Sequence, residues 1–412
     1  MMRVVSLLLV ALATLPAQQV FTERVKGFRI YGTSEEKLPI AFLTSRPVTI
    51  EFDLADRQPA NVELRFFHCD RNWRRTETRF INDEILMRTK FVLPYQPAPQ
   101  GVEQYRFTYK IAVPAYPVFD RFPASGNYEV ELWDVERKEH LATGRFFVVE
   151  QVITTGLSIE NRLLPSSDHP WNKAHRMNAR VVVGAKDSLD GQPLYPILLT
   201  TVALYKNREF GRQIRIDVND DNPNTFVDGL GMRTMTFTVD NMLPGNEYRR
   251  LDLRSVDEYP ITTSLHRLRG GADVSRFLKA APADNNGASF LLSGTRSADY
   301  LQFQFEFVDD RWNVDSVYVV GTFNEWEPSE RSLMQRTENG RFVLPVQLKR
   351  GVHEYQYVLR SDDWVSLEGN DWRTVNLYTA FVYYRDQRFG GFDRIIGFAQ
   401  GLSTRSVSPT SH

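Results

Sequence analysis

The chain has 412 residues, enough for two to four domains at about 100–200 residues each. Hydrophobic residues make up 42% of it, as in proteins with packed cores, and the formal net charge of -1 gives no global field toward nucleic acid or an anionic membrane. Cys69 is the one cysteine, which excludes an intramolecular disulfide and a multi-cysteine zinc site.

The first residues resemble an export signal. A short positive region at residues 1–3 precedes an apolar stretch from Val4 to Leu12, and Ala17 supplies a small residue at the cleavage position. We therefore predict a signal peptide over residues 1–17. We expect no direct membrane insertion by the rest of the chain, because no later segment approaches the run of about 18 apolar residues that a spanning helix needs.

Alternation of apolar and polar residues dominates the remaining chain. It runs over residues 48–54, 128–133, 234–239 and 300–308, and each run is bounded by Gly, Pro, Asn or Asp. Helical periodicity is nearly absent, and its best candidate, residues 75–90, is short and broken. The pattern predicts an all-β fold of consecutive immunoglobulin-like or early-set β-sandwich domains.

Domain boundaries are predicted where the alternating runs stop and Pro, Ser, Gly and Ala take over. A first sandwich is expected over residues 18–150 and a second over residues 151–289, which includes a linker-like stretch at 279–287. A third sandwich is expected over residues 290–390. Residues 391–412, which become rich in Ser and Thr, are expected to form a C-terminal tail.

Catalytic and metal-binding patterns are weak throughout. Asp217, Asn219 and Asp221 are spaced like half a calcium loop, but Asn222 replaces the glycine of that loop, and a hairpin turn explains the residues equally well. The histidines at 169 and 175 have no regular ligand spacing, and Cys69 on a predicted strand is expected to be a buried, inert thiol. We therefore predict no catalytic residues, no metal, no cofactor and no enzymatic activity.

A basic cluster follows the run that contains Cys69. Its members are Arg71, Arg74, Arg75 and Arg79. Such a cluster is either a solvated face or a contact patch for an acidic partner, and both interpretations remain open.

The third predicted domain carries the sharpest motif. Residues 317–326 read VYVVGTFNEW, residues 339–342 read NGRF, and residues 349–358 read KRGVHEYQYV. This order resembles the early-set sandwich of glycogen-binding modules. In carbohydrate-binding relatives Trp326 and Trp364 would offer flat faces to a sugar, although Gln356 stands where a Lys often follows the Tyr. The other interpretation is that both tryptophans pack inside the sandwich.

Three further motifs point to one family. They are FHCDRNW at residues 67–73, FPASGNY at 122–128 and LPGNEYRRLD at 243–252. In this order, and followed by the module above, they resemble the plug protein of the bacterial type 9 secretion system. The resemblance implies a periplasmic protein, peripheral at the outer membrane, that binds the periplasmic mouth of the large translocon barrel and seals it when idle.

The resemblance also implies a partner set. The expected partner is the outer-membrane barrel, with no nucleic acid and no small-molecule substrate. The alternative is a periplasmic carbohydrate-binding protein that acts through the third domain with Trp326 and Trp364 as its sugar platform.

Overall fold

The computed structural model describes residues 17–32, 38–163, 175–261, 264–275, 284–309, 314–359, 363–371 and 373–403, with the side chains of residues 163 and 175 excepted. The predicted signal peptide lies outside these residues, apart from Ala17. Across the described ranges the regular structure is almost entirely β, which confirms the predicted fold class. The helices found there are short 3₁₀ turns, namely η1 (Pro196–Leu198), η2 (Glu330–Ser332) and η3 (Arg388–Gly390). No helix in this part of the chain has the length and hydropathy that a membrane crossing requires.

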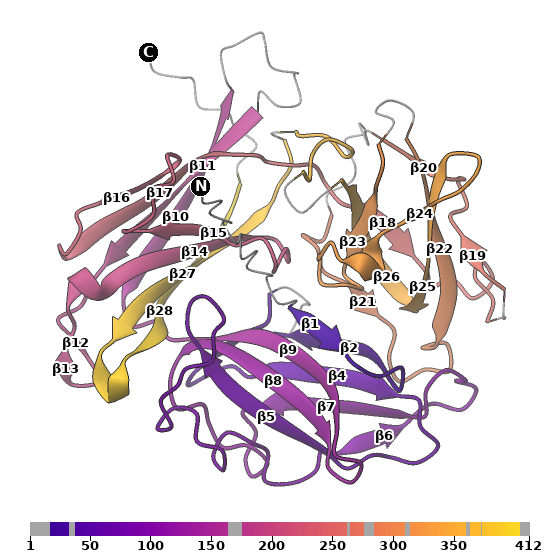
Figure 1. Ribbon diagram of the computed structural model, residues 1–412, viewed down its shortest axis with the longest axis horizontal. Coiled ribbons are helices and arrows are strands. Elements are labelled where there is room, and N and C mark those ends of the chain that lie inside the picture. The colour runs from indigo at the N-terminus through magenta and orange to yellow at the C-terminus, as the bar shows by residue number, and fades with distance from the viewer. Residues whose placement is uncertain are drawn as a thin grey trace, which may run out of the picture.

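Residues 75–90, the helical candidate, form turns and isolated bridges. They belong to the connection that follows the fifth strand of the first sandwich (Figure 1). The strands of this sandwich are β1 (Gln18–Val20), β2 (Val25–Tyr31), β3 (Ile40–Phe42), β4 (Val48–Leu54), β5 (Val62–Cys69), β6 (Tyr95–Pro97), β7 (Phe107–Val113), β8 (Gly126–Asp134) and β9 (Glu139–Val149).

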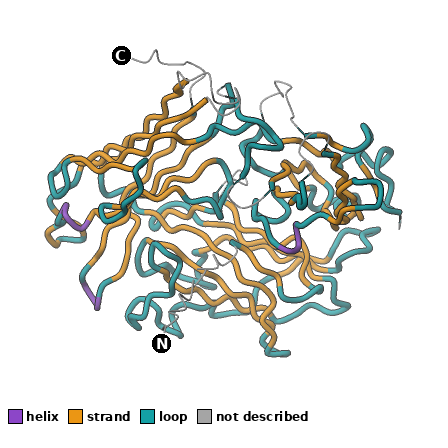
Figure 2. The backbone as a smooth tube through the Cα atoms, turned by 45° about the horizontal axis from the view of Figure 1, so that its top comes forward, coloured by secondary structure: helices purple, strands orange, loops and turns teal. Residues whose placement is uncertain are grey.

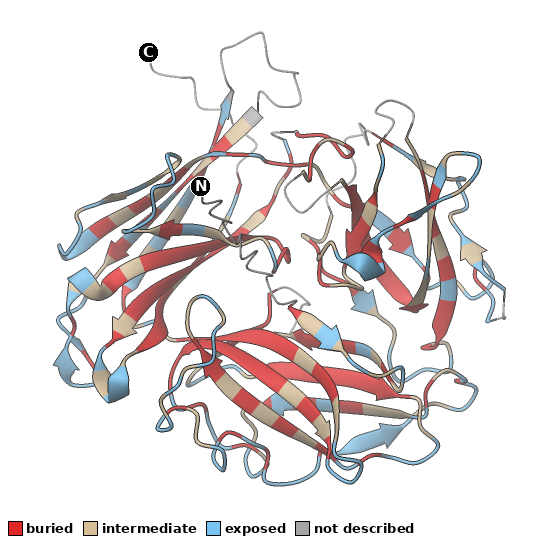
Figure 3. Ribbon diagram, in the orientation of Figure 1, coloured by how far each residue is buried: buried red, intermediate tan, exposed pale blue. Residues whose placement is uncertain are grey.

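The first sandwich closes over one apolar core. One sheet has the order β1-β9-β8-β5, with β3 parallel to β9, and the facing sheet has the order β2-β4-β7-β6. Val62, Leu64 and Phe66 alternate toward this core along β5, as a half-buried strand requires. Figure 3 shows that burial concentrates on the strands of the three sandwiches, while the connecting loops are exposed.

The second sandwich is assembled from two separate parts of the chain. Its strands are β10 (Thr154–Leu163), β11 (His175–Gly184), β12 (Ser188–Leu189), β13 (Gln192–Pro193), β14 (Leu199–Lys206), β15 (Ile214–Asp217), β16 (Thr225–Asp228), β17 (Thr234–Met242), β27 (Leu377–Asp386) and β28 (Phe392–Leu402). One sheet has the order β10-β11-β17-β16 and the other β15-β14-β27-β28. The last two strands therefore return to a sandwich that began more than 200 residues earlier.

The third sandwich is inserted between β17 and β27. Its strands are β18 (Arg249–Asp252), β19 (His266–Arg267), β20 (Asp273–Val274), β21 (Phe290–Leu291), β22 (Tyr300–Val308), β23 (Tyr318–Gly321), β24 (Gln335–Arg336), β25 (Arg341–Lys349) and β26 (Gly351–Val358). They form one sheet of order β18-β26-β21, with β23 also on β26, and one of order β19-β22-β25-β24, with β20 also on β22. Figures 1 and 2 show the three sandwiches grouped side by side.

This insertion differs from the predicted boundaries. The described residues between 249 and 289 begin the third sandwich instead of ending the second, and residues 392–402 form a paired strand where a tail was expected. In Figure 1 the yellow C-terminal strands β27 and β28 lie beside the pink β14, away from the orange third sandwich. The reason is that pairing between strands about 180 residues apart leaves no trace in local alternation, which reports only which face of a strand is buried.

Two chain crossings join the second and third sandwiches, and carboxylates hold them together. The Glu247 carboxylate accepts hydrogen bonds from the backbone N–H groups of Val375 and Asp284, each at 3.0 Å. Beside these crossings, within the third sandwich, the Glu354 carboxylate accepts from Asn285 N at 2.6 Å and from Gly287 N at 2.8 Å. The motif LPGNEYRRLD at residues 243–252 contains the first of the two crossings, which leads from β17 into β18.

The buried Glu354 carboxyl predicts a pH dependence of stability. Burial, together with the nearby Asp284, raises the pKa of Glu354 to about 8. Because an unfolded glutamate titrates near pH 4.3, roughly, the folded chain binds the extra proton between these values, so this group lowers stability as pH rises from about 4 to about 8. In urea titrations across this range, Glu354→Gln should flatten the fall in unfolding free energy. An unchanged slope would contradict this prediction.

Candidate partner interface

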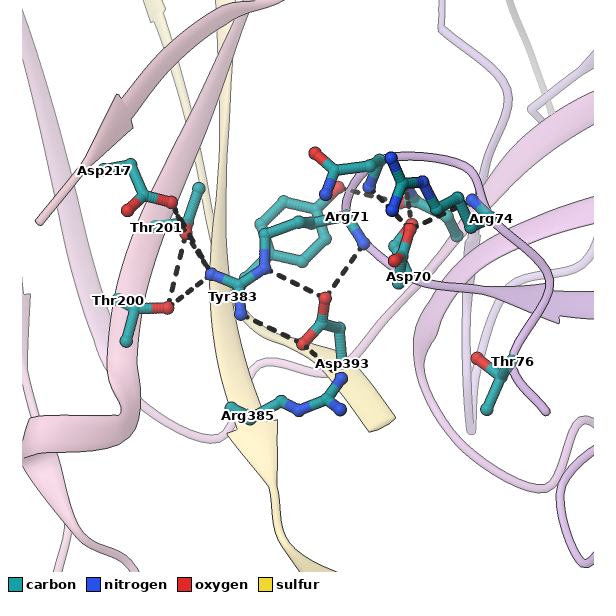
Figure 4. Close-up of polar contacts among 12 residues, drawn as sticks. Asp70, Arg71, Arg74, Thr76, Thr200, Thr201, Asp217, Tyr383, Arg385 and Asp393 are labelled. Carbon is teal, nitrogen blue, oxygen red and sulfur yellow. Dashed lines mark hydrogen bonds and ion pairs between the residues drawn. The ribbon is translucent and has the colours of Figure 1, made fainter. Parts of the chain in front are cut away.

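The predicted basic cluster lies on the connection from β5 to β6, and the structure divides it. The Asp70 side chain accepts hydrogen bonds from the backbone N–H groups of Asn72 at 2.8 Å and Arg74 at 3.0 Å, which folds the chain into a tight turn. This turn directs Arg71 toward the second sandwich (Figure 4). The four arginines therefore do not form one exposed patch.

Arg71 is part of the joint between the first and second sandwiches. Its Nε donates to Asp393 Oδ2 at 2.9 Å, its backbone N–H donates to the same oxygen at 3.0 Å, and its Nη1 donates to the hydroxyls of Thr200 and Thr201. The exposed fraction of the Asp393 side chain is 2%. Burial alone would raise the pKa of Asp393, but the hydrogen bonds and charge of Arg71 hold it below its usual range.

Loss of the Arg71–Asp393 ion pair should lower the stability of the whole chain. Arg71→Met removes the main cation from a carboxylate that stays buried, so we expect the unfolding free energy to fall by about 3 kcal/mol. Arg233→Met is a matched control, because Arg233 and Asp187 form a pair in which both side chains are 76% exposed, and such pairs contribute at most about 1 kcal/mol. Urea unfolding midpoints measure both. Equal shifts of the urea midpoint for the two variants would contradict a stabilising role for the Arg71–Asp393 ion pair.

Aromatic packing completes this joint. Trp73 packs against Phe147 at a ring separation of 5.3 Å and against Phe210 of the second sandwich at 5.2 Å. Phe147 in turn stacks on Phe381 of β27 at 4.3 Å. Phe146 faces the core of the first sandwich while Phe147 faces the second, so β9 is buried on both sides. The continuous apolar run at residues 146–149 is the sequence signal that could have indicated this second interface.

The motifs at residues 67–73 and 122–128 meet at the same joint. His68 is fully buried, with Nδ1 2.8 Å from Thr76 Oγ1 and Nε2 3.1 Å from the Ser125 carbonyl, and burial lowers its pKa to about 4. Gly126 has a φ of +148°, and a Cβ there would lie 2.3 Å from the His68 imidazole. Asn127 accepts a hydrogen bond from Tyr383 on β27 at 2.7 Å.

The remaining members of the basic cluster face solvent to different degrees. Arg75 forms ion pairs with Glu129 and Glu131, and its guanidinium lies 3.6 Å from the centre of the Phe67 ring, so its charge is neutralised within the sheet. Arg74 and Arg79 are exposed. Arg79 lines the edge of an open groove of about 860 Å³, which is formed by the β3–β4, β5–β6 and β7–β8 connections. This groove is the candidate partner interface.

The proposed sugar platform does not exist in the folded third sandwich. Trp326 is 0% exposed, packs on Tyr248 at 4.0 Å, and donates its Nε1–H to the Gly287 carbonyl at 3.2 Å. Trp364 is 4% exposed, with the Arg212 guanidinium 4.2 Å from its ring centre. Stacking on a sugar needs an open ring face, and neither tryptophan presents one. The motif specifies packing instead.

A substitution separates these two roles of Trp326. Trp326→Ala should lower the unfolding free energy by about 3–5 kcal/mol, because it removes a fully buried aromatic side chain. Thermal or urea unfolding gives the effect, and retention on an α-glucan column gives the alternative. An unchanged melt with lost retention would support the sugar platform.

The described residues offer little for metal or thiol chemistry. Cys69 is buried, as predicted, and burial raises the pKa of its thiol to about 12. The Asp217 carboxylate accepts from the Thr201 hydroxyl at 2.6 Å and from Asn219 N at 3.0 Å, which is a turn. Within the described part of the chain, no group of three or more His, Cys, Asp or Glu has a metal-binding arrangement. Residue 169 and the side chain of residue 175 lie outside it.

Comparisons with known proteins agree with this architecture. A crystal structure of a hypothetical protein from Parabacteroides merdae is similar with a TM-score of 0.74 at 20% identity, covering 93% of this chain and 98% of that one. This likeness shows that the overall fold is shared. Three N-terminal domains of the highly immunogenic outer capsid protein of bacteriophage RB49 align at 12% identity over 92% of this chain and 98% of theirs, but the TM-score of 0.14 supports no inference.

No curated protein sequence gives a significant match. The family comparison does: residues 25–150 match the model described as the type 9 secretion system plug protein 1st domain. This match covers the first sandwich from β2 to the end of β9, including two of the three motifs that carry the resemblance. Residues 25–150 are therefore a plug-protein first domain, which confirms the predicted resemblance to the type 9 secretion system plug family.

Proposed function

We propose that this chain is the periplasmic plug that binds the periplasmic mouth of the outer-membrane translocon barrel and seals it when no substrate passes. The observation that carries the proposal is the match of the first sandwich to the plug family. That match supports a plug role in type 9 secretion. The location at the outer membrane, the barrel as partner and the sealing are the proposed steps.

The contacts between the sandwiches support a plug that acts by filling the pore. A plug must keep its shape against the pore, and buried ion pairs connect each sandwich to the others. Arg71 pairs with Asp393 between the first and second, and Lys349 with Asp53 between the third and first, at 2.9 Å and 2.6 Å. Arg208 of the second pairs with Glu325 of the third at 2.8 Å. A block braced in this way fills space without moving parts, and we propose that it has no catalytic role.

Two measurements test the proposal together. A tagged chain should capture the barrel from a detergent extract of outer membranes, identified by mass spectrometry. A deletion strain should become sensitive to large antibiotics that an intact outer membrane excludes. Unchanged sensitivity with the barrel present and expressed would count against sealing, and capture of no barrel would count against the partner.

A further inference from the structure

The groove beside Arg79 joins three connections of the first sandwich that are distant in sequence. Its floor is buried and apolar, made by Ile81, Met87, Phe119 and Phe122, which are each at most 4% exposed. Its rim carries large apolar side chains that remain in water. Leu86 is 70% exposed.

Further exposed apolar side chains lie on the rim of the groove and beyond it along the same connection. Phe80 is 63% exposed, Ile85 is 70% exposed and Phe91 is 58% exposed. Phe80 also stacks on Phe389 of the second sandwich at 3.9 Å, so the surface continues to the neighbouring domain. Clustered exposed apolar side chains beside polar groups are typical of sites where a protein partner binds.

The charged side chains that line the groove are mainly cationic. Arg79, Arg88 and Arg121 line the groove, and none of the three pairs with a carboxylate among the described residues. The two acidic side chains of the lining are already engaged. Asp120 pairs with Lys90 at 2.5 Å, and the Asp83 carboxylate accepts backbone N–H groups of the turn that follows it. Unpaired cations therefore surround an apolar floor.

We propose that this groove receives an acidic segment of the translocon barrel that also carries large apolar side chains. The inference rests on the proposed function, which supplies the barrel as partner. The apolar floor and rim would bury the apolar side chains of that segment, and the three arginines would pair with its carboxylates. Rim charges mainly set association rate and its salt dependence, while the buried apolar contacts set residence time.

The test uses the full chain and the purified barrel in detergent. Biolayer interferometry with immobilised barrel is run at 50 and 300 mM salt. Arg79→Glu/Arg88→Glu should reduce the association rate about tenfold or more at low salt and remove most of the salt dependence. Leu86→Ser should raise the dissociation rate about tenfold, because it empties the rim contact.

Matched controls lie on the second sandwich. Arg233→Glu reverses an exposed charge and Met232→Ser replaces a side chain that is 66% exposed, and both should bind as wild type does. Unchanged melting temperatures show that the variants fold. A synthetic 12-residue peptide of repeated Asp-Leu-Glu-Phe should compete with the barrel, and one of repeated Lys-Leu-Lys-Phe should not.

The outcomes separate the two proposals. Wild-type chain that does not bind the barrel would overturn the proposed function. Wild-type binding with groove variants that bind as tightly as the controls would overturn the groove assignment and leave the proposed function standing. Competition by the Lys peptide instead of the acidic one would overturn the partner chemistry.

Discussion

Ending the chain at residue 390 is expected to unfold the second sandwich, since it removes β28. This strand pairs with β27 along its whole length, from Leu377↔Leu402 to Asp386↔Phe392. Ile395 and Ile396 are fully buried, and each stabilises the fold by about 1.5–3 kcal/mol. These losses and the exposed edge of β27 compare with a typical total stability of about 5–15 kcal/mol.

Charge adds to the same effect. The truncation also removes Asp393, the carboxylate nearest to Arg71, and Arg394, the cation that pairs with Glu150. We expect loss of the cooperative unfolding transition of the second sandwich, and fast hydrogen exchange in β14 and β27, while the first sandwich keeps secondary structure. If residues 391–412 were a tail, the truncated chain would melt as the full chain does, and that result would contradict the interleaved fold.

Lys349→Met is expected to cost about 3–5 kcal/mol of unfolding free energy. The Lys349 Nζ lies 2.6 Å from Asp53 Oδ2, and the two side chains are 5% and 2% exposed. Tyr300 donates its hydroxyl to the same oxygen at 2.8 Å. Removal of the cation leaves the Asp53 carboxylate buried between the third and first sandwiches with no countercharge.

Lys90→Met serves as the control for this change. The Lys90–Asp120 pair has side chains 49% and 46% exposed, and surface pairs contribute about 0–1 kcal/mol. The difference in urea midpoint between the two variants isolates the effect of burial. A Lys349→Met chain as stable as the Lys90→Met chain would show that the interdomain pair does not brace the assembly.

Local alternation predicted the strands well. The runs at residues 48–54 and 300–308 coincide with β4 and β22 in every residue. Each of these strands packs its apolar face on a sandwich core. The opposite face of β4 is buried as well, but it stays polar because Glu51 and Asp53 form ion pairs there. The all-β fold class follows from such runs alone.

The order of strands within sheets could not be predicted in the same way. β27 pairs with β14 and places Phe381 opposite Ala203. No local pattern near either residue specifies that partner. The linear division into consecutive domains therefore placed β27 and β28 outside the sandwich that they complete. Only the burial of both faces, seen in the apolar run at residues 146–149, indicated extra contacts.

The three motifs of the plug resemblance lie where the sandwiches meet. Arg71 and Gly126 stand at the joint between the first and second sandwiches, and Glu247 stands at the crossing into the third. Joints demand particular side chains because each must satisfy buried polar groups from two domains. The groove floor is apolar and makes fewer such demands. Its position was therefore indicated in the sequence only by Arg79.

Conductance of the barrel in planar lipid bilayers tests the central claim most directly. The proposed function predicts that the barrel alone gives open-channel current, and that adding this chain on the periplasmic side reduces the current to the baseline of the bilayer. Arg79→Glu/Arg88→Glu should require a higher concentration for the same block. A barrel that binds this chain and continues to conduct at its full open level would contradict the plug.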